Sequence, residues 1–113
     1  MVMLYNSVQP GAAPAGAAAV ATATGGTIAT SLSGVPIAVT RQSPAAAVTG
    51  VILAAGLYNG QTITVIDEAV AANTITFAAA PGGGVADGAQ AIAGLTARTF
   101  VWDSGTSLWY RAA

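Results

Sequence analysis

The segment from Asn59 to Arg111 constrains the fold most strongly, because it alternates short runs of β-branched and aromatic residues with turns of small residues. Asn59-Gly60 is a turn signal, since both residue types accept the positive φ values of tight hairpin turns. The glycine run after Pro81 predicts a loop. The segment ends in an aromatic motif with the sequence FVWDSGTSLWYR. Such a succession of strands and turns predicts an all-β module.

Alternating side chains predict where the strands lie. In Thr62–Asp67, for example, Ile63 and Val65 share one face and the two threonines share the other. We expect this strand to pair with the next one in a meander, and the last two strands to form a closing hairpin. The expected strands are Val35–Thr40, Val48–Ala54, Thr62–Asp67, Asn73–Ala78, Arg98–Asp103 and Leu108–Arg111, with Ile92–Leu95 either a short strand or a bend. The predicted fold class is all-β, a small β-sandwich or barrel of short antiparallel strands.

Residues 1–34 differ from the rest of the chain, because they consist mainly of Ala, Gly, Thr, Ser and Pro. Alanine favours helix, but Pro14 and the Gly25-Gly26 pair interrupt any long helix. We therefore expect an extended arm here. The predicted organisation is an arm over residues 1–34 and a β-domain over residues 35–113.

Charge is scarce in this sequence. Charged residues make up 6% of the 113 residues, against about 25% in an average soluble protein. A β-domain of this size has a marginal core, and a monomer with so few charges risks self-association, so we expect a homo-oligomer. The net charge of −1 gives no electrostatic footprint for nucleic acid or an anionic membrane. The apolar stretch from Ala12 to Ala23 is too short to span a bilayer, and the N-terminus lacks the pattern of a secretory signal. The sequence thus predicts a soluble protein with no nucleic-acid or membrane partner.

Few residues are suited to catalysis or metal binding. Cys, His and Lys are absent from the sequence, which removes thiolate ligands and the usual general base. Asp67 and Glu68 are neighbours, but successive strand residues point to opposite faces, so we expect both to be solvated at a strand end. Asp87 and Asp103 lie in predicted turns without the spacing of a calcium loop. No catalytic residue, metal site or cofactor is therefore predicted.

Four aromatic residues lie close to the C-terminus: Phe100, Trp102, Trp109 and Tyr110. They allow two interpretations. One is a sugar-stacking platform, and the other is a core for the terminal hairpin together with its subunit contacts. The core interpretation is favoured.

Three pieces of the chain follow one another in a recognisable order. They are Ser43–Asp67 (SPAAAVTGVILAAGLYNGQTITVID), Ala72–Ala78 (ANTITFA) followed by Val85–Gly88 (VADG), and Ile92–Arg111 (IAGLTARTFVWDSGTSLWYR). This succession resembles a β-module of tailed-bacteriophage virion proteins, which include capsid decoration (cement) proteins and head fibres. The terminal hairpin motif is the most specific of the three pieces.

The resemblance implies a non-enzymatic virion structural protein on the outer surface of a phage capsid, made in the cytoplasm of the bacterial host. A decoration protein of this kind binds the major capsid protein, stabilises contacts between its subunits and forms a trimer. The candidate capsid or subunit contacts are apolar residues of the arm and the terminal hairpin: Leu4, Tyr5, Val8, Val20, Ile28, Leu32, Trp102, Trp109 and Tyr110. The alternative is a receptor- or glycan-binding module of a phage head or tail fibre. The absence of a shaft repeat favours decoration.

Overall fold

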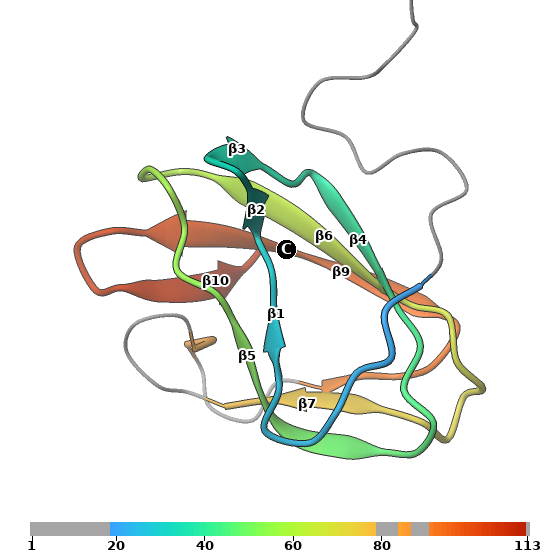
Figure 1. Ribbon diagram of the computed structural model, residues 1–113. Coiled ribbons are helices and arrows are strands. Elements are labelled where there is room, and N and C mark those ends of the chain that lie inside the picture. The colour runs from blue at the N-terminus through green and yellow to red at the C-terminus, as the bar shows by residue number, and fades with distance from the viewer. Residues whose placement is uncertain (1–18, 79–83, 87–90, 113) are drawn as a thin grey trace, which may run out of the picture.

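The computed structural model describes residues 19–78, 84–86 and 91–112. These residues form ten strands and no helix, so the all-β prediction is confirmed (Figure 1). The strands are β1 (Thr27–Ile28), β2 (Ser31–Leu32), β3 (Val35–Pro36), β4 (Val39–Gln42), β5 (Val48–Leu53), β6 (Thr62–Asp67), β7 (Ile75–Phe77), β8 (Ala91–Ile92), β9 (Thr96–Asp103) and β10 (Leu108–Arg111).

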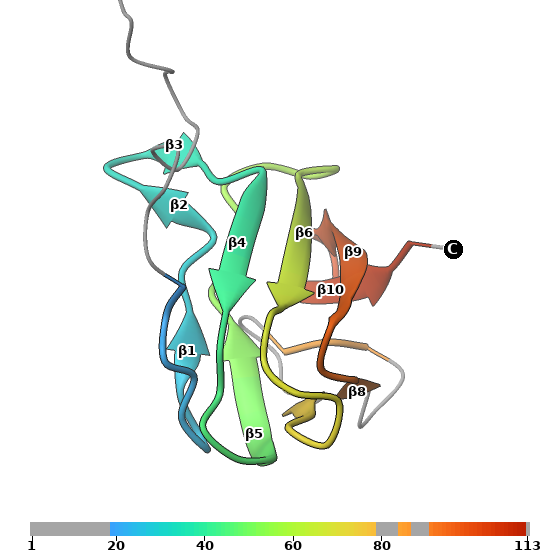
Figure 2. The same ribbon diagram turned by 90° about the vertical axis from the view of Figure 1, so that its right-hand side faces the viewer.

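The strands form two four-stranded sheets and a small hairpin. The larger sheet has the order β10-β9-β6-β4, and the smaller sheet has the order β1-β5-β7-β8. Seen from the side, β4, β6 and β9 lie in front of β1 and β5 as a separate layer (Figure 2). The sheets do not close into one barrel, so the sandwich is the better description of the two that the sequence allows. The remaining strands, β2 and β3, pair with each other.

Strand pairing differs from the predicted antiparallel meander. β9 pairs antiparallel with both β6 and β10, which confirms the closing hairpin. Three other pairs are parallel: β1 with β5, β4 with β6, and β5 with β7. The expected pairing of β6 with β7 is wrong, because the two strands belong to different sheets. The corner between them carries the chain from one layer to the other, so both strands bury alternate residues in the same core.

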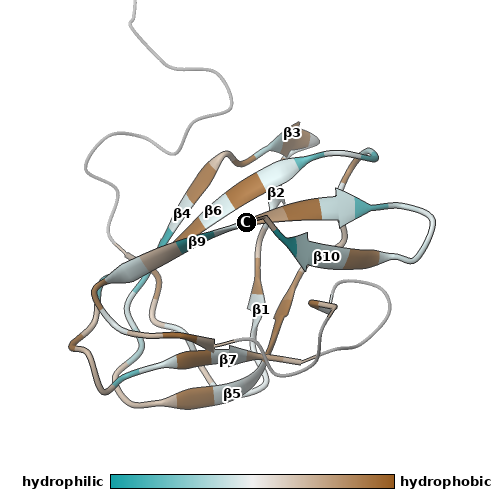
Figure 3. Cartoon of the chain, turned by 180° about the vertical axis from the view of Figure 1, so that it is seen from behind, coloured by the Kyte–Doolittle hydropathy of each residue, from teal (hydrophilic) through white to brown (hydrophobic). Residues whose placement is uncertain are grey.

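The core fills the space between the two sheets. Figure 3 shows its origin as alternating apolar and paler bands along β6. Two aromatic pairs lie at its centre: Phe77 meets Phe100 edge to face, and the rings of Trp102 and Trp109 are 5.3 Å apart. The buried cluster consists of Ile28, Val48, Val51, Leu53, Ile63, Val65, Ile75, Phe77, Val85, Ile92, Phe100, Trp102 and Trp109.

Residues 19–32 pair with strands of the β-domain, and Ile28 and Thr30 within them are buried. The chain pairs first with β4 through a parallel bridge between Val20 and Gln42. It then pairs with β5 as strand β1, where Ile28 is buried. The arm expected over residues 1–34 is thus described only from residue 19, and its described part is packed on the β-domain. Residues 1–18 lie outside the described part of the chain.

Both edges of the larger sheet carry an extra backbone bridge. On β4, the amide of Val20 donates to the carbonyl of Arg41, and its own carbonyl accepts from Ser43. On β10, Trp109 donates to the carbonyl of Gly84 and accepts from the amide of Ala86. The edge strands of this sheet are therefore already hydrogen-bonded to other segments of the same chain.

Candidate functional site

The outer side of the larger sheet is the most extended surface that the strand register defines. Inward residues of β6 and β9, such as Val65 and Phe100, are buried, so the alternate residues face outward. Cross-strand pairs place Thr64 beside Thr99 and Val39 on this side. We define the outer face as Val39, Arg41, Thr62, Thr64, Ile66, Ala97, Thr99, Val101 and Tyr110.

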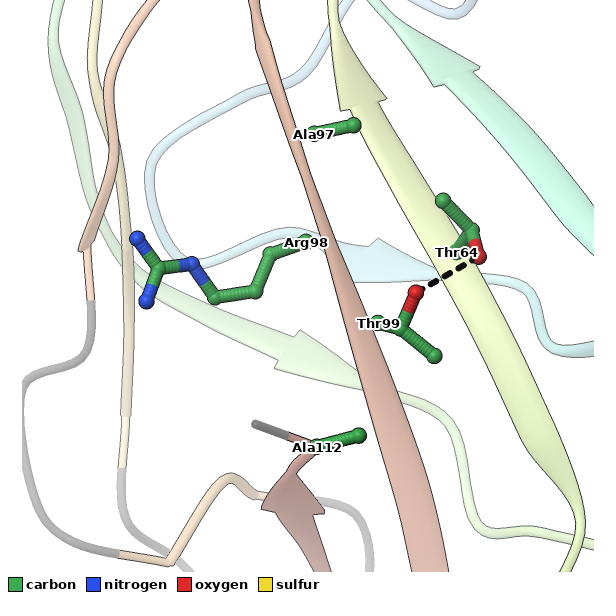
Figure 4. A pocket seen from close by; sticks show the side chains of 5 residues that line it. All are labelled: Thr64, Ala97, Arg98, Thr99 and Ala112. Carbon is green, nitrogen blue, oxygen red and sulfur yellow. Dashed lines mark hydrogen bonds between the residues drawn. The ribbon is translucent and has the colours of Figure 1, made fainter.

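A shallow hollow of about 400 Å³ lies on the outer face, lined by Thr64, Ala97, Arg98, Thr99 and Ala112 (Figure 4). The hydroxyls of Thr64 and Thr99 are 2.8 Å apart and bond to each other. Arg98 extends from the other side of β9, away from this hydroxyl pair. The hollow is therefore lined by two hydroxyls that bond to each other, by two alanines and by part of Arg98.

Asp67 is buried, contrary to the expectation that it is solvated. It ends β6 on the inward side, with no exposed surface. One carboxylate oxygen, Oδ1, accepts a hydrogen bond from the amide of Ala69, while Oδ2 has no hydrogen-bond partner within the described residues. Burial raises the pKa of this carboxyl, and the Ala69 hydrogen bond opposes that shift in part. The alternation that places Ile63 and Val65 on the inward side of β6 also places Asp67 there, so the signal for its burial was present in the sequence.

Glu68, the next residue, points outward and pairs with Arg41 on β4. Both Nε and Nη2 of the guanidinium donate to the carboxylate. This contact raises the pKa of Arg41 and lowers the pKa of Glu68. The pair is exposed, so solvent screens it and its net contribution to stability is small. Within the described part of the chain, the pair neutralises two charges at this corner of the outer face.

Asp103 acts in a turn. Its Oδ1 accepts from the amide of Gly105, and its Oδ2 accepts from the hydroxyl of Thr106, which fixes the connection between β9 and β10. The other turn aspartate, Asp87, lies outside the described residues. Among the described residues, no group of three or more His, Cys, Asp or Glu side chains could hold a metal ion.

The nine candidate contact residues have different positions. Leu4, Tyr5 and Val8 lie outside the described part of the chain. Val20 and Leu32 are largely exposed, at 57% and 69%. Tyr110 is partly exposed, on the outer face.

The remaining three candidates, Ile28, Trp102 and Trp109, are buried and belong to the core. Packing within the chain covers these three side chains, so a single chain leaves them almost no surface for a contact with another protein. The core interpretation of the two tryptophans is confirmed by the same burial. Neither tryptophan can stack on a sugar in this structure, because neither indole ring has a face exposed to solvent.

Sequence reasoning missed the outer face as a unit. The alternating threonines were recognised, but they were expected to form a ladder between β6 and β7. The observed ladder joins Thr64 to Thr99 instead. In β9, the alternate residues Ala97, Thr99 and Val101 face the same side as the outward residues of β6. This match identifies the outer face only when β6 and β9 are known to pair.

Comparison with protein-family models, with curated proteins and with solved structures gives no match. Within the described residues, no helix is long and apolar enough to cross a membrane.

The buried Asp67 leads to a prediction about pH. Because its folded-state pKa is raised, its favourable contribution is complete below the ordinary carboxyl pKa and is lost as the pH rises through the raised value. Asp67→Asn keeps an acceptor for the Ala69 amide and carries no charge. We expect it to raise the free energy of unfolding at pH 7 by on the order of 1 kcal/mol and to give no gain near pH 3. Thermal unfolding from pH 3 to 8 measures both.

Glu68→Gln is the matched control for this prediction. The lowered pKa of Glu68 gives a contribution present above its ordinary value and lost on acidification, so the sign is opposite. We expect a small loss at pH 7 and none near pH 3, since the Arg41 pair is exposed. An Asp67→Asn protein that is less stable than the wild type at every pH would contradict the assignment.

Proposed function

We propose that this chain is a non-enzymatic structural protein of a phage virion, which binds the outside of the capsid as a decoration or cement protein. In this role it contacts the major capsid protein, stabilises contacts between capsid subunits and acts as a trimer. The assignment places the protein on the virion surface after synthesis in the bacterial cytoplasm.

The observation that carries the proposal is the scarcity of charged side chains on the surface of this all-β module. The tryptophans of its aromatic motif are buried in the core. Of the described acidic residues, Asp67 is buried, Glu68 is paired with Arg41 and Asp103 holds a turn. The rest of the described surface carries small and β-branched side chains together with exposed larger apolar residues such as Leu57, Tyr58 and Leu95. Such a surface is suited to packing against another protein.

The aromatic motif supports the same proposal. The residues that resemble the phage module most closely, in FVWDSGTSLWYR, form the β9–β10 hairpin. Their two tryptophans fill the core, so the motif specifies a scaffold. The exposed surface of that scaffold is then left to determine what the protein binds.

Two measurements test the proposal. Light scattering on the purified protein gives its native mass, which we expect to be three times that of the single chain. Sedimentation with undecorated shells, assembled from the major capsid protein of the source genome, measures binding. We expect saturable binding and a higher melting temperature for the decorated shell. Wild-type protein that stays in the supernatant at every concentration overturns the proposal.

A further inference from the structure

The turn at Asn59-Gly60 contains a dipeptide that can react with itself. In an Asn-Gly sequence, the amide nitrogen of the glycine can attack the side-chain carbonyl carbon of the asparagine, because glycine has no side chain to hinder the approach. A new C–N bond closes a cyclic imide, and ammonia leaves. Water then opens the imide at either carbonyl and gives aspartate or isoaspartate. This is the one Asn-Gly pair in the sequence.

The backbone of this turn has a conformation that opposes the reaction. The amide of Gln61 donates to the carbonyl of Tyr58 at 3.1 Å, which closes the turn. Gly60 has a φ of 89°, and Asn59 before it stays outside the left-handed region, as in a type II turn. Closing the imide requires the peptide group between Asn59 and Gly60 to rotate until the glycine nitrogen faces the asparagine side chain. That rotation breaks the turn.

Both reacting groups are also hydrogen-bonded to the β9–β10 hairpin. The N–H of Gly60, which must lose its proton for the nitrogen to attack, donates to the carbonyl of Trp102 at 2.9 Å. The side-chain Oδ1 of Asn59 accepts from the backbone amide of Ser104 at 3.0 Å. The β5–β6 connection and the β9–β10 turn thus meet at one end of the sandwich (Figure 1). The hairpin restrains the nucleophile and the electrophile at once.

Solvent has free access to the reacting atoms. Asn59 and Gly60 are both exposed, and a Cβ built on Gly60 would meet nothing within 4 Å. Packing therefore does not shield the dipeptide, and the hydrogen bonds of the turn are what oppose the reaction. Opening of this turn alone releases them, and exposed turns open at a lower free energy than the core.

We propose that Asn59 is a deamidation site that the β5–β6 turn controls. It reacts when the turn opens and stays intact while the turn is closed. The reaction needs only water and this chain, so it is independent of what the protein binds. The product adds one negative charge to a chain whose formal net charge is −1.

The two products affect the fold differently. Aspartate retains a side-chain oxygen for the amide of Ser104. Isoaspartate carries the backbone through the side-chain carbon and lengthens it, so the hydrogen bond from Gln61 to Tyr58 is lost. Gln61 is buried, and its side chain bonds to the amide of Leu57 and the carbonyl of Thr30. We therefore expect the isoaspartate form to melt at a lower temperature, and Asn59→Asp to melt as the wild type does.

Mass spectrometry of peptides measures the reaction over time in the full chain at mildly alkaline pH. Fragmentation places the mass change between Tyr58 and Gln61 and separates it from any change at Asn73. Isomerisation at Asp87-Gly88 changes no mass, so it does not interfere. We expect the native protein to react at least about tenfold more slowly than the same chain unfolded in guanidinium chloride. Native rates should stay constant at low denaturant concentrations, because opening of one turn exposes little surface.

Asp103→Ala tests the hairpin as the control element. Asp103 bonds to Gly105 and Thr106 and so holds the turn that carries Ser104. We expect its loss to speed deamidation of the folded protein by roughly threefold or more. Ser104→Ala is the matched control, because the backbone amide that bonds Asn59 remains and only a hydroxyl 3.4 Å away is lost. It should react within about twofold of the wild type, and melting curves verify that both variants are folded.

Several results would overturn the proposal. Native protein that deamidates as fast as the unfolded chain shows that the turn exerts no control, and native protein that reacts faster shows that the Ser104 amide activates the carbonyl instead. An unfolded chain that leaves Asn59 intact removes the site itself. Equal rates for Asp103→Ala and Ser104→Ala overturn the role of the hairpin, and a native rate that rises steeply with denaturant assigns the reaction to global unfolding.

Discussion

Trp109→Ala is expected to remove a large share of the free energy of unfolding. Trp109 has no exposed surface and contacts the Trp102 ring in the core. Its Nε1–H donates to the carbonyl of Ala54 at 2.8 Å, which joins β10 to the end of β5 in the opposite sheet. Truncation of a buried tryptophan costs about 3–5 kcal/mol, and a domain of this length has roughly 5–15 kcal/mol in total.

Chemical denaturation followed by circular dichroism measures this loss. The matched control is Tyr110→Ala, which changes the next residue on the same strand. Tyr110 is 36% exposed, and its hydroxyl bonds to Thr106 at the surface, so we expect a cost below about 1 kcal/mol. Equal denaturation midpoints for the two variants would show that the tryptophan does not hold the sheets together.

Truncation at the N-terminus is expected to have a sharp boundary between residues 18 and 34. A chain of residues 19–113 retains β1, whereas a chain of residues 35–113 loses it. Loss of Ile28 opens the core beside β5, and loss of Thr30 removes hydrogen bonds to the carbonyls of Ala54 and Ala55. It also leaves the buried Gln61 amide without its acceptor, the carbonyl of Thr30.

Thermal unfolding of the two purified truncations tests this boundary. We expect a cooperative transition for residues 19–113 and none for residues 35–113. We expect that removal of residues 1–34 unfolds the domain. Loss of shell binding by that truncated chain would therefore not show that the arm itself binds the shell. Cooperative unfolding of the chain of residues 35–113 would contradict this prediction and show that residues 19–34 are not needed for the fold.

The strands that were predicted well are those whose own side chains specify them. β6 and β7 were recognised because apolar and polar residues alternate at the period of a strand, and the buried faces match. β10 was recognised as the strand that returns after the Ser104–Thr106 turn. The turn at Asn59-Gly60 was also identified, and Gly60 has a positive φ of 89° there. These are local features, set by residues a few positions apart.

The parts that were missed depend on partners distant in the chain. Alternation says which side of β6 is buried, but it does not say that β4 and β9 are the neighbours. The N-terminal segment contains few large apolar residues, so nothing local predicts that Val20 bridges to Gln42. The burial of Ile28 was missed for the same reason.

The bridges on β4 and β10 also bear on how this protein behaves at high concentration. A sheet edge with unpaired amides and carbonyls can pair with a strand of another chain and so start aggregation. Many proteins place lysine on the edge strand, which disfavours such pairing. This sequence has no lysine. Short segments of its own backbone, around Val20 and Val85, occupy the positions where another chain would add. Within the described residues, the two edge strands of the larger sheet are thus protected in part by pairing with the protein's own backbone, in a sequence that has few charges to serve that purpose.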